Sequence, residues 1–185
     1  MQVRELIPED APLMLEWMHD EDVVRFLRGD FKSKTIEDCE AFITSSISEE
    51  NKSFAIVSDA NEYMGTVTLR NIKNRSAEFA ITVRSAAMSR GYSWFGMDKI
   101  LDLAFNELNL EFVYWCVSKH NVRAIRFYDK HGFQRMDKVS LELTERYMNS
   151  NNGINDLIWY SVSKNDIRNE EIMSLKHIPE VKGDR

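Results

Sequence analysis

The hydrophobic positions of this chain follow a two-residue period in some segments and a helical period in others, and these patterns predict its strands and helices. Alternation near the start predicts a strand over 2–7, which Pro8 ends. Apolar residues at helical spacing follow, and they predict a helix that begins at Glu9-Asp10. The segment 20–27 continues helically after a break, and a capping-box pattern opens a further helix over 35–48.

The middle of the chain predicts three strands. They span 52–58, 63–70 and 77–83, and are joined by a turn at 59–62 and a polar loop at 72–76. Gly65 lies inside the second strand, which indicates a bulge or the close approach of another backbone. An amphipathic helix then runs from about residue 92 to residue 108.

The last third predicts a strand, a helix and a hairpin. Residues 112–117 are apolar throughout, which suits a central strand covered on both faces. Asn121 caps a helix to about His131, and Gly132 supplies its left-handed end. Two strands, 133–143 and 156–163, follow with a turn of the hairpin type at 149–153. The order predicts an α/β fold with a mixed, partly parallel central sheet of about seven strands and about four helices, in one domain over 1–163 before a polar tail at 164–185.

The junction between strand 77–83 and the next helix predicts a binding site. The loop 89–93 opens directly onto the helix, so free backbone N–H groups and the positive end of the helix dipole face solvent there. Such a junction suits a phosphate or pyrophosphate. The alternative is that Gly91 makes a plain helix-entry turn.

Composition excludes several classes of function. The chain has 185 residues and a net charge of −6, which argues against a nucleic-acid binder held by phosphate neutralisation. Neither a membrane span nor a signal peptide is apparent. Cys39 and Cys116 are far apart and indicate free thiols in a reducing cytoplasm. The four histidines lack metal-ligand spacing, so no metal site is expected.

Two motifs give the chain a resemblance. The run from Asn121 to Phe133 matches N-x-x-A-x-x-x-Y-x-x-x-G-F at every marked position. The loop partly matches Q/R-x-x-G-x-G/A, with Met88 and Ser93 out of pattern and a bulky Trp94 just inside the helix. Together they resemble the GNAT acetyltransferases over residues 2–163, in the branch of ribosomal-protein N-terminal, spermidine and amino-sugar acetyltransferases.

The resemblance implies acetyl-CoA as co-substrate and no metal. It implies that the loop holds the pyrophosphate through backbone donors and that the pantetheine arm pairs with the strand at 81–83. The implied cofactor-binding residues are Ile81, Thr82, Val83, Met88, Ser89, Arg90, Gly91, Tyr92, Ser93, Asn121, Ala124 and Tyr128. Asn121 could also be only the helix cap.

Two residues are expected to be catalytic. Tyr128 shares a helix face with Asn121 and Ala124, and its hydroxyl can donate a proton to the leaving thiolate; the alternative is a core tyrosine. Glu78 lies among apolar neighbours and could relay the proton of the amine through water, or it could orient the substrate electrostatically. Asp156 is a weaker candidate for contact with the amine.

The expected function is transfer of an acetyl group from acetyl-CoA to a primary amine by direct attack in a ternary complex. The acceptor is a protein N-terminus or a small-molecule amine. The expected protein is cytoplasmic, a monomer or homodimer, with no nucleic-acid or membrane partner. The alternative is a non-catalytic module that binds or senses acyl-CoA.

Overall fold

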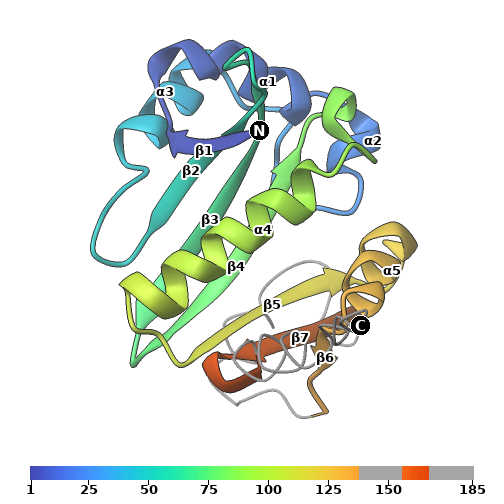
Figure 1. Ribbon diagram of the computed structural model, residues 1–185. Helices are drawn as coiled ribbons and strands as arrows, with labels where there is room; N and C mark the ends of the chain where they lie inside the picture. The colour runs from blue at the N-terminus through green and yellow to red at the C-terminus, as the bar shows by residue number, and fades with distance from the viewer. Residues whose placement is uncertain (138–155, 167–185) are drawn as a thin grey trace, which may run out of the picture.

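A seven-stranded sheet runs through the molecule in the order β1-β2-β3-β4-β5-β7-β6 (Figure 1). The structure is a computed structural model, and it describes residues 1–137 and 156–166. The strands are β1 Gln2–Glu5, β2 Lys52–Val57, β3 Tyr63–Lys73, β4 Ser76–Val83, β5 Phe112–Ser118, β6 Gln134–Arg135 and β7 Leu157–Ser163. Only β4 and β5 pair in parallel, whereas all other neighbours in this described sheet are antiparallel. The predicted α/β class and the partly parallel sheet are confirmed.

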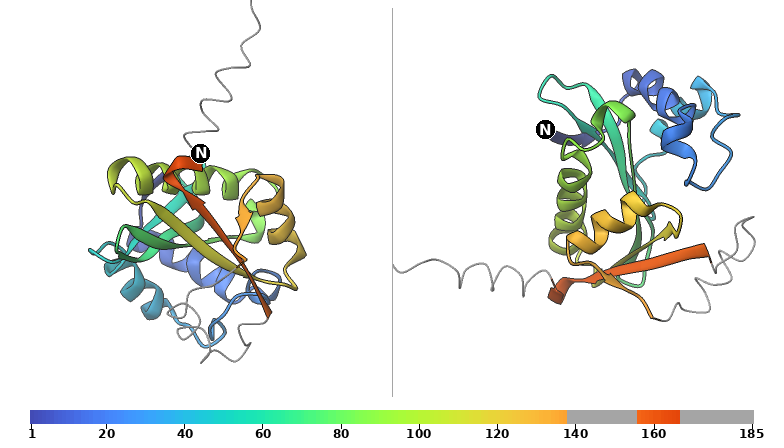
Figure 2. Two further views of the ribbon diagram at one scale, coloured as in Figure 1. Left: turned by 90° about the horizontal axis from the view of Figure 1, so that it is seen from below. Right: turned by 90° about the vertical axis from the view of Figure 1, so that its right-hand side faces the viewer.

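Helices cover both faces of the sheet (Figure 2). They are α1 Ala11–Met18, α2 Glu21–Val24, α3 Ile36–Thr44, α4 Tyr92–Asp102 and α5 Val122–Lys130. The first three lie on one side of the sheet and α4 on the other (Figure 2). The described residues thus hold slightly more helices than the expected four, because short 3₁₀ segments at Pro8–Asp10 and Ser85–Ala87 and a π segment at Leu103–Glu107 add to α1–α5.

Each face of the sheet has its own apolar core. On the α4 side, Ala77, Phe79 and Val83 of β4 pack with α4 and α5. On the other side, α1 and α3 pack on β2 and the start of β3. Gly96 brings α4 close to the sheet, since a Cβ there would lie 2.3 Å from Cδ1 of Ile56.

β4 and β5 are joined over only three residue pairs. The parallel ladder comprises Ser76–Phe112, Ala77–Val113 and Glu78–Tyr114, after which the two strands diverge (Figure 1). Beyond this point β4 continues to pair with β3 and β5 continues to pair with β7. The facing edges therefore form a V whose vertex lies at Glu78 and Tyr114.

The predicted bulge at Gly65 is confirmed. The register with β2 shifts between Ile56 and Val57, which pair with Gly65 and Tyr63 respectively. A Cβ on Gly65 would lie 2.4 Å from the carbonyl oxygen of Thr82, so the backbone of β4 also approaches closely. Both expectations for this glycine hold.

Several predicted boundaries are wrong. The expected loop at 72–76 is a tight turn, because β3 runs on to Lys73 and β4 begins at Ser76. Asn74 and Arg75 both have positive φ, at 48° and 58°, which suits a two-residue hairpin turn. The helix expected to reach residue 48 ends at Thr44. The predicted turn at 149–153 and most of the strand 133–143 lie outside the described residues, as does most of the tail 164–185.

Neither cysteine forms a disulfide. Within 1–137 and 156–166, the helices are too short or too polar to cross a membrane. The same residues contain no group of three side chains suited to a metal ion.

Candidate active site

The loop before α4 presents unpaired backbone donors. Gly91 is the N-cap of α4 in the left-handed region, with φ of 87°, and Ser89 also has positive φ, at 60°. Among the described residues, the N–H groups of Gly91, Tyr92 and Ser93 have no acceptor. These donors sit at the positive end of an eleven-residue helix, so the loop fits an anion such as a pyrophosphate.

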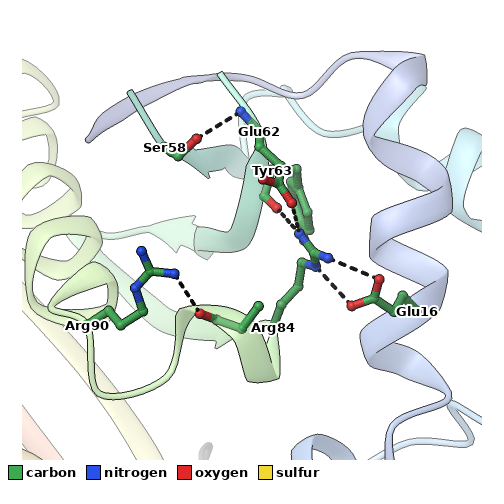
Figure 3. Close-up of polar contacts among 7 residues, drawn as sticks. Glu16, Ser58, Glu62, Tyr63, Arg84 and Arg90 are labelled. Carbon is green, nitrogen blue, oxygen red and sulfur yellow. Dashed lines mark hydrogen bonds and ion pairs between the residues drawn. The ribbon is translucent and has the colours of Figure 1, made fainter. Parts of the chain in front are cut away.

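Arg84 anchors this loop to the rest of the molecule (Figure 3). Its Nε and Nη2 donate to the two carboxylate oxygens of Glu16, each at 3.0 Å. Its Nη1 donates to the carboxylate of Glu62 at 2.8 Å and to the carbonyl oxygen of Tyr63 at 2.9 Å. The guanidinium is buried, and it joins α1, the start of β3 and the end of β4 immediately before the loop.

The cofactor residues predicted on β4 lie on the open edge of the V. Ile81, Thr82 and Val83 pair with β3 on one side and lie beyond the last pair with β5 on the other. Within the described part of the chain, the edge of β4 that faces β5 has no strand partner past Glu78. An unpaired edge of this kind can bind an extended amide-containing chain as an added strand.

α5 carries the second motif against β5. The side chain of Asn121 accepts a hydrogen bond from the N–H of Ala124 at 3.1 Å, so its role as helix cap is confirmed. Tyr128 is buried, and its ring centroid lies 5.2 Å from that of Trp115 and 5.1 Å from that of Tyr160. Burial raises the pKa of the Tyr128 hydroxyl, so the hydroxyl is protonated at neutral pH.

Glu78 lies at the vertex of the V and is also buried. Arg70 of β3 donates to its Oε1 at 2.5 Å, and the side-chain amide of Asn71 donates to its Oε2 at 3.2 Å. Residue alternation places Glu78 on the face opposite to Phe79, which packs with Tyr128 in the α4-side core. The two expected catalytic residues therefore lie on opposite faces of the sheet, and these faces meet where β4 and β5 separate.

The other candidates lie apart from the vertex. Asp156 pairs with Lys119, and this ion pair lowers the pKa of the Asp156 carboxyl. His120 is exposed on the loop before α5. On α5, Arg123 contacts the sulfur of Met88, and Arg126 and Lys130 are exposed on the same helix.

The acidic segment 16–22 is already paired within the protein. Glu16 binds Arg84, Asp20 accepts from the hydroxyl of Ser85, and Glu21 binds Lys32. These three carboxylates therefore already have partners within the described residues.

Sequence reasoning missed two arginines and the splayed strands. Arg70 lies four residues before the hairpin turn at 74–75, and its contact with Glu78 depends on the register of β3 and β4. Arg84 had a usable signal, because it follows an apolar strand and precedes the phosphate-like loop directly.

The family comparison agrees with these geometric observations. A family model for the acetyltransferase (GNAT) domain matches residues 1–134. Acetyltransferase PseH of Campylobacter jejuni is 22% identical over 134 residues, which cover 72% of this chain and 83% of that protein. Spermidine N(1)-acetyltransferase of Vibrio cholerae is 33% identical over 81 residues, covering 42% of this chain and 47% of that protein.

Solved structures share the fold. A spermidine N-acetyltransferase from Vibrio cholerae in complex with CoA and spermine has a TM-score of 0.72 at 19% identity, covering 89% of this chain and 95% of that one. A GNAT-family acetyltransferase from Bacillus anthracis has a TM-score of 0.69 at 17% identity, covering 88% and 94%. The predictions of the family, of the fold and of an acetyltransferase enzyme are confirmed: the chain belongs to the GNAT acetyltransferase family.

Proposed function

We propose that this protein transfers the acetyl group of acetyl-CoA to a primary amine by direct attack in a ternary complex. The observation that carries the proposal is the V between β4 and β5, with one unpaired strand edge leading from its vertex to the donors at Gly91, Tyr92 and Ser93. Such an edge fits the amides of a pantetheine arm, and such donors fit its pyrophosphate.

Within this proposal the predicted site residues have the following tasks. The N–H groups of the loop hold the pyrophosphate, and Ile81, Thr82 and Val83 hold the pantetheine arm through their backbone. Asn121 and Ala124 lie at the start of α5, which we place on the other side of the V. Bound acetyl-CoA supplies the acetyl group as an activated thioester.

Tyr128 then acts as acid toward the sulfur. Burial keeps its hydroxyl protonated, so it can donate a hydrogen bond to the thiolate as charge develops there. Glu78 acts from the other face on the amine. Because its carboxylate already binds Arg70 and Asn71, orientation of the amine is its better-supported task, ahead of a proton relay; the ammonium then gives its proton to solvent water before the neutral amine attacks.

The ion pair at Glu78 also gives the alternative its support. Both carboxylate oxygens of Glu78 already accept hydrogen bonds, and this is the observation in favour of a non-catalytic module that binds acyl-CoA and senses it. The family membership and the retained Tyr128 on α5 favour the enzyme. Turnover with any amine would exclude the non-catalytic module.

A screen of amine substrates should identify the class of the acetyl acceptor. Names of similar proteins include a spermidine acetyltransferase, and the sequence motifs resemble a branch that also acts on protein N-termini and amino sugars. CoA should first raise the melting temperature of the protein, as linkage requires for a specific ligand. CoA release should then be measured with a peptide N-terminus, a polyamine and an amino sugar. Absence of a thermal shift at saturating CoA contradicts both enzyme and module.

We expect the protein to act in the cytoplasm as a monomer or homodimer, without a nucleic-acid or membrane partner. The net charge of −6 supports the absence of nucleic acid.

A further inference from the structure

One tryptophan lies on the surface beside the loop. Trp94 is 43% exposed, whereas Trp17, Trp115 and Trp159 are at most 5% exposed. An exposed indole of this size at the entry of α4 is not needed for the core. It therefore requires an explanation of its own.

The indole is held in place by aromatic neighbours on α5 and directly after its C-terminus. Its ring stacks on the imidazole of His131, with centroids 4.1 Å apart and planes 15° from parallel. Phe127 and Phe133 flank it at 6.5 Å and 6.4 Å. The Nδ1 atom of His131 lies 2.7 Å from the carbonyl oxygen of Phe127, and this hydrogen bond fixes the imidazole. One face of Trp94 is thus covered by a fixed ring, and the exposed part of the indole is available to a second flat partner.

The position of Trp94 limits what that partner can be. Trp94 follows Ser93, one of the unpaired donors, in the first turn of α4. Helical side chains lean toward the N-terminus, so the indole extends over the turn that carries these donors. A ligand whose pyrophosphate binds the loop would have its adjoining group within reach of the indole.

We propose that Trp94, backed by His131, is the stacking site for the adenine base of CoA. The inference rests on the proposed function, because the pyrophosphate of CoA must occupy the loop for the adenosine to reach Trp94. A base stacks on an aromatic face without specific hydrogen bonds, which matches a platform of aromatic rings beside a phosphate site. His131 acts as a positioning residue for the indole.

Fluorescence of the unmodified protein gives the first test. Because the other three tryptophans are buried, acrylamide should quench mainly Trp94. Saturating CoA should protect this emission, whereas saturating 4′-phosphopantetheine, which lacks the adenosine, should leave quenching unchanged. Equal protection by the two ligands, or no protection by CoA, overturns the proposal.

Binding by variants gives the second test. Trp94→Ala should weaken CoA by about tenfold, toward the lower part of the range for one base–aromatic stack, and leave 4′-phosphopantetheine unchanged. Trp94→Phe should retain most of the CoA affinity, and Phe42→Ala, at another exposed aromatic residue, should change neither ligand. Because Trp94 lies outside the apolar core clusters, the Trp94→Ala apoprotein should still unfold cooperatively.

The outcomes separate the two proposals. If the parent protein binds neither ligand, the proposed function fails and this subsite fails with it. If the parent binds both ligands and Trp94→Ala weakens neither, or weakens both alike, only the subsite is overturned. Unchanged CoA affinity in Trp94→Ala, with a smaller mass in size-exclusion chromatography, overturns it in favour of a contact with a second copy of the chain.

Discussion

Gly91 is the residue at which backbone geometry alone should control cofactor binding. Its φ of 87° lies in the left-handed region, and the nearest atom to a Cβ placed there is Cε of Met1 at 3.7 Å. A side chain at this position therefore meets no steric obstacle in the surrounding structure. Any cost of Gly91→Val comes from the conformation of the residue itself.

That cost can be worked from the conformation. A residue with a Cβ pays about 1–2 kcal/mol in the left-handed region, and a β-branched residue is disfavoured further. If valine keeps the positive φ, the strain lowers the free energy of unfolding. If the loop relaxes instead, the backbone donors move and the binding free energy of CoA becomes less favourable, with a tenfold loss of affinity for each ~1.4 kcal/mol. The two losses together should reach at least ~1–2 kcal/mol.

Gly91→Asn is the matched control. Asparagine adopts the left-handed region far more readily than valine, so this variant should unfold and bind CoA nearly as the parent does. Urea unfolding of the apoprotein and calorimetric titration with CoA measure the two quantities separately. Equal behaviour of the valine and asparagine variants, or a summed loss below about 0.5 kcal/mol for valine, would show that the conformation of residue 91 does not control CoA binding.

Three further predictions concern the catalytic residues, the loop anchor and the packing of α4. Tyr128→Phe and Glu78→Gln should each lower kcat and leave the Kd for CoA nearly unchanged; full activity in both variants would remove their assigned roles. Arg84→Lys cannot reproduce the paired contacts of the buried guanidinium, so the free energy of unfolding should fall by about 1–3 kcal/mol in urea titration, and no loss would contradict the anchor. Gly96→Ala should lower the free energy of unfolding by about 1–3 kcal/mol despite the better helix propensity of alanine, because its Cβ would lie 2.3 Å from Cδ1 of Ile56. If this clash is the cause, adding Ile56→Val should recover part of the loss.

The sheet was largely predictable because its strands obey simple patterns. Period-2 alternation and the apolar run at 112–117 located the five strands from β1 to β5, and capping residues located α3 and α5. The boundary at 72–76 failed for a specific reason. Asn71, Asn74 and Arg75 adopt positive φ, so polar residues that resemble a loop belong to an irregular strand end and a two-residue turn.

The pairing around Glu78 was not predictable from local pattern. Its contact with Arg70 requires the antiparallel register of β3 and β4, and that register depends on the irregular end of β3. Alternation could place Glu78 opposite Phe79, but it could not show that a guanidinium from the neighbouring strand would engage the carboxylate. The sequence therefore left a proton relay and an orienting role open, and the contact with Arg70 is the reason that we propose orientation.

The V could not be predicted from the sequence pattern, because it arises where β4 and β5 stop forming hydrogen bonds with each other. Residues of β4 and β5 look the same whether the strands stay paired or diverge, since each still packs its apolar face on α4 and α5. The two strands diverge after the pair Glu78–Tyr114. The buried carboxylate of β4 therefore lies at the point where the gap between the strands begins to connect the two faces of the sheet. Tyr128 lies on the α4 side and Glu78 on the other, so the proposed roles of the two residues require that both act on the thioester through this opening. Strand separation, more than either side chain, is therefore the structural basis of the proposed chemistry.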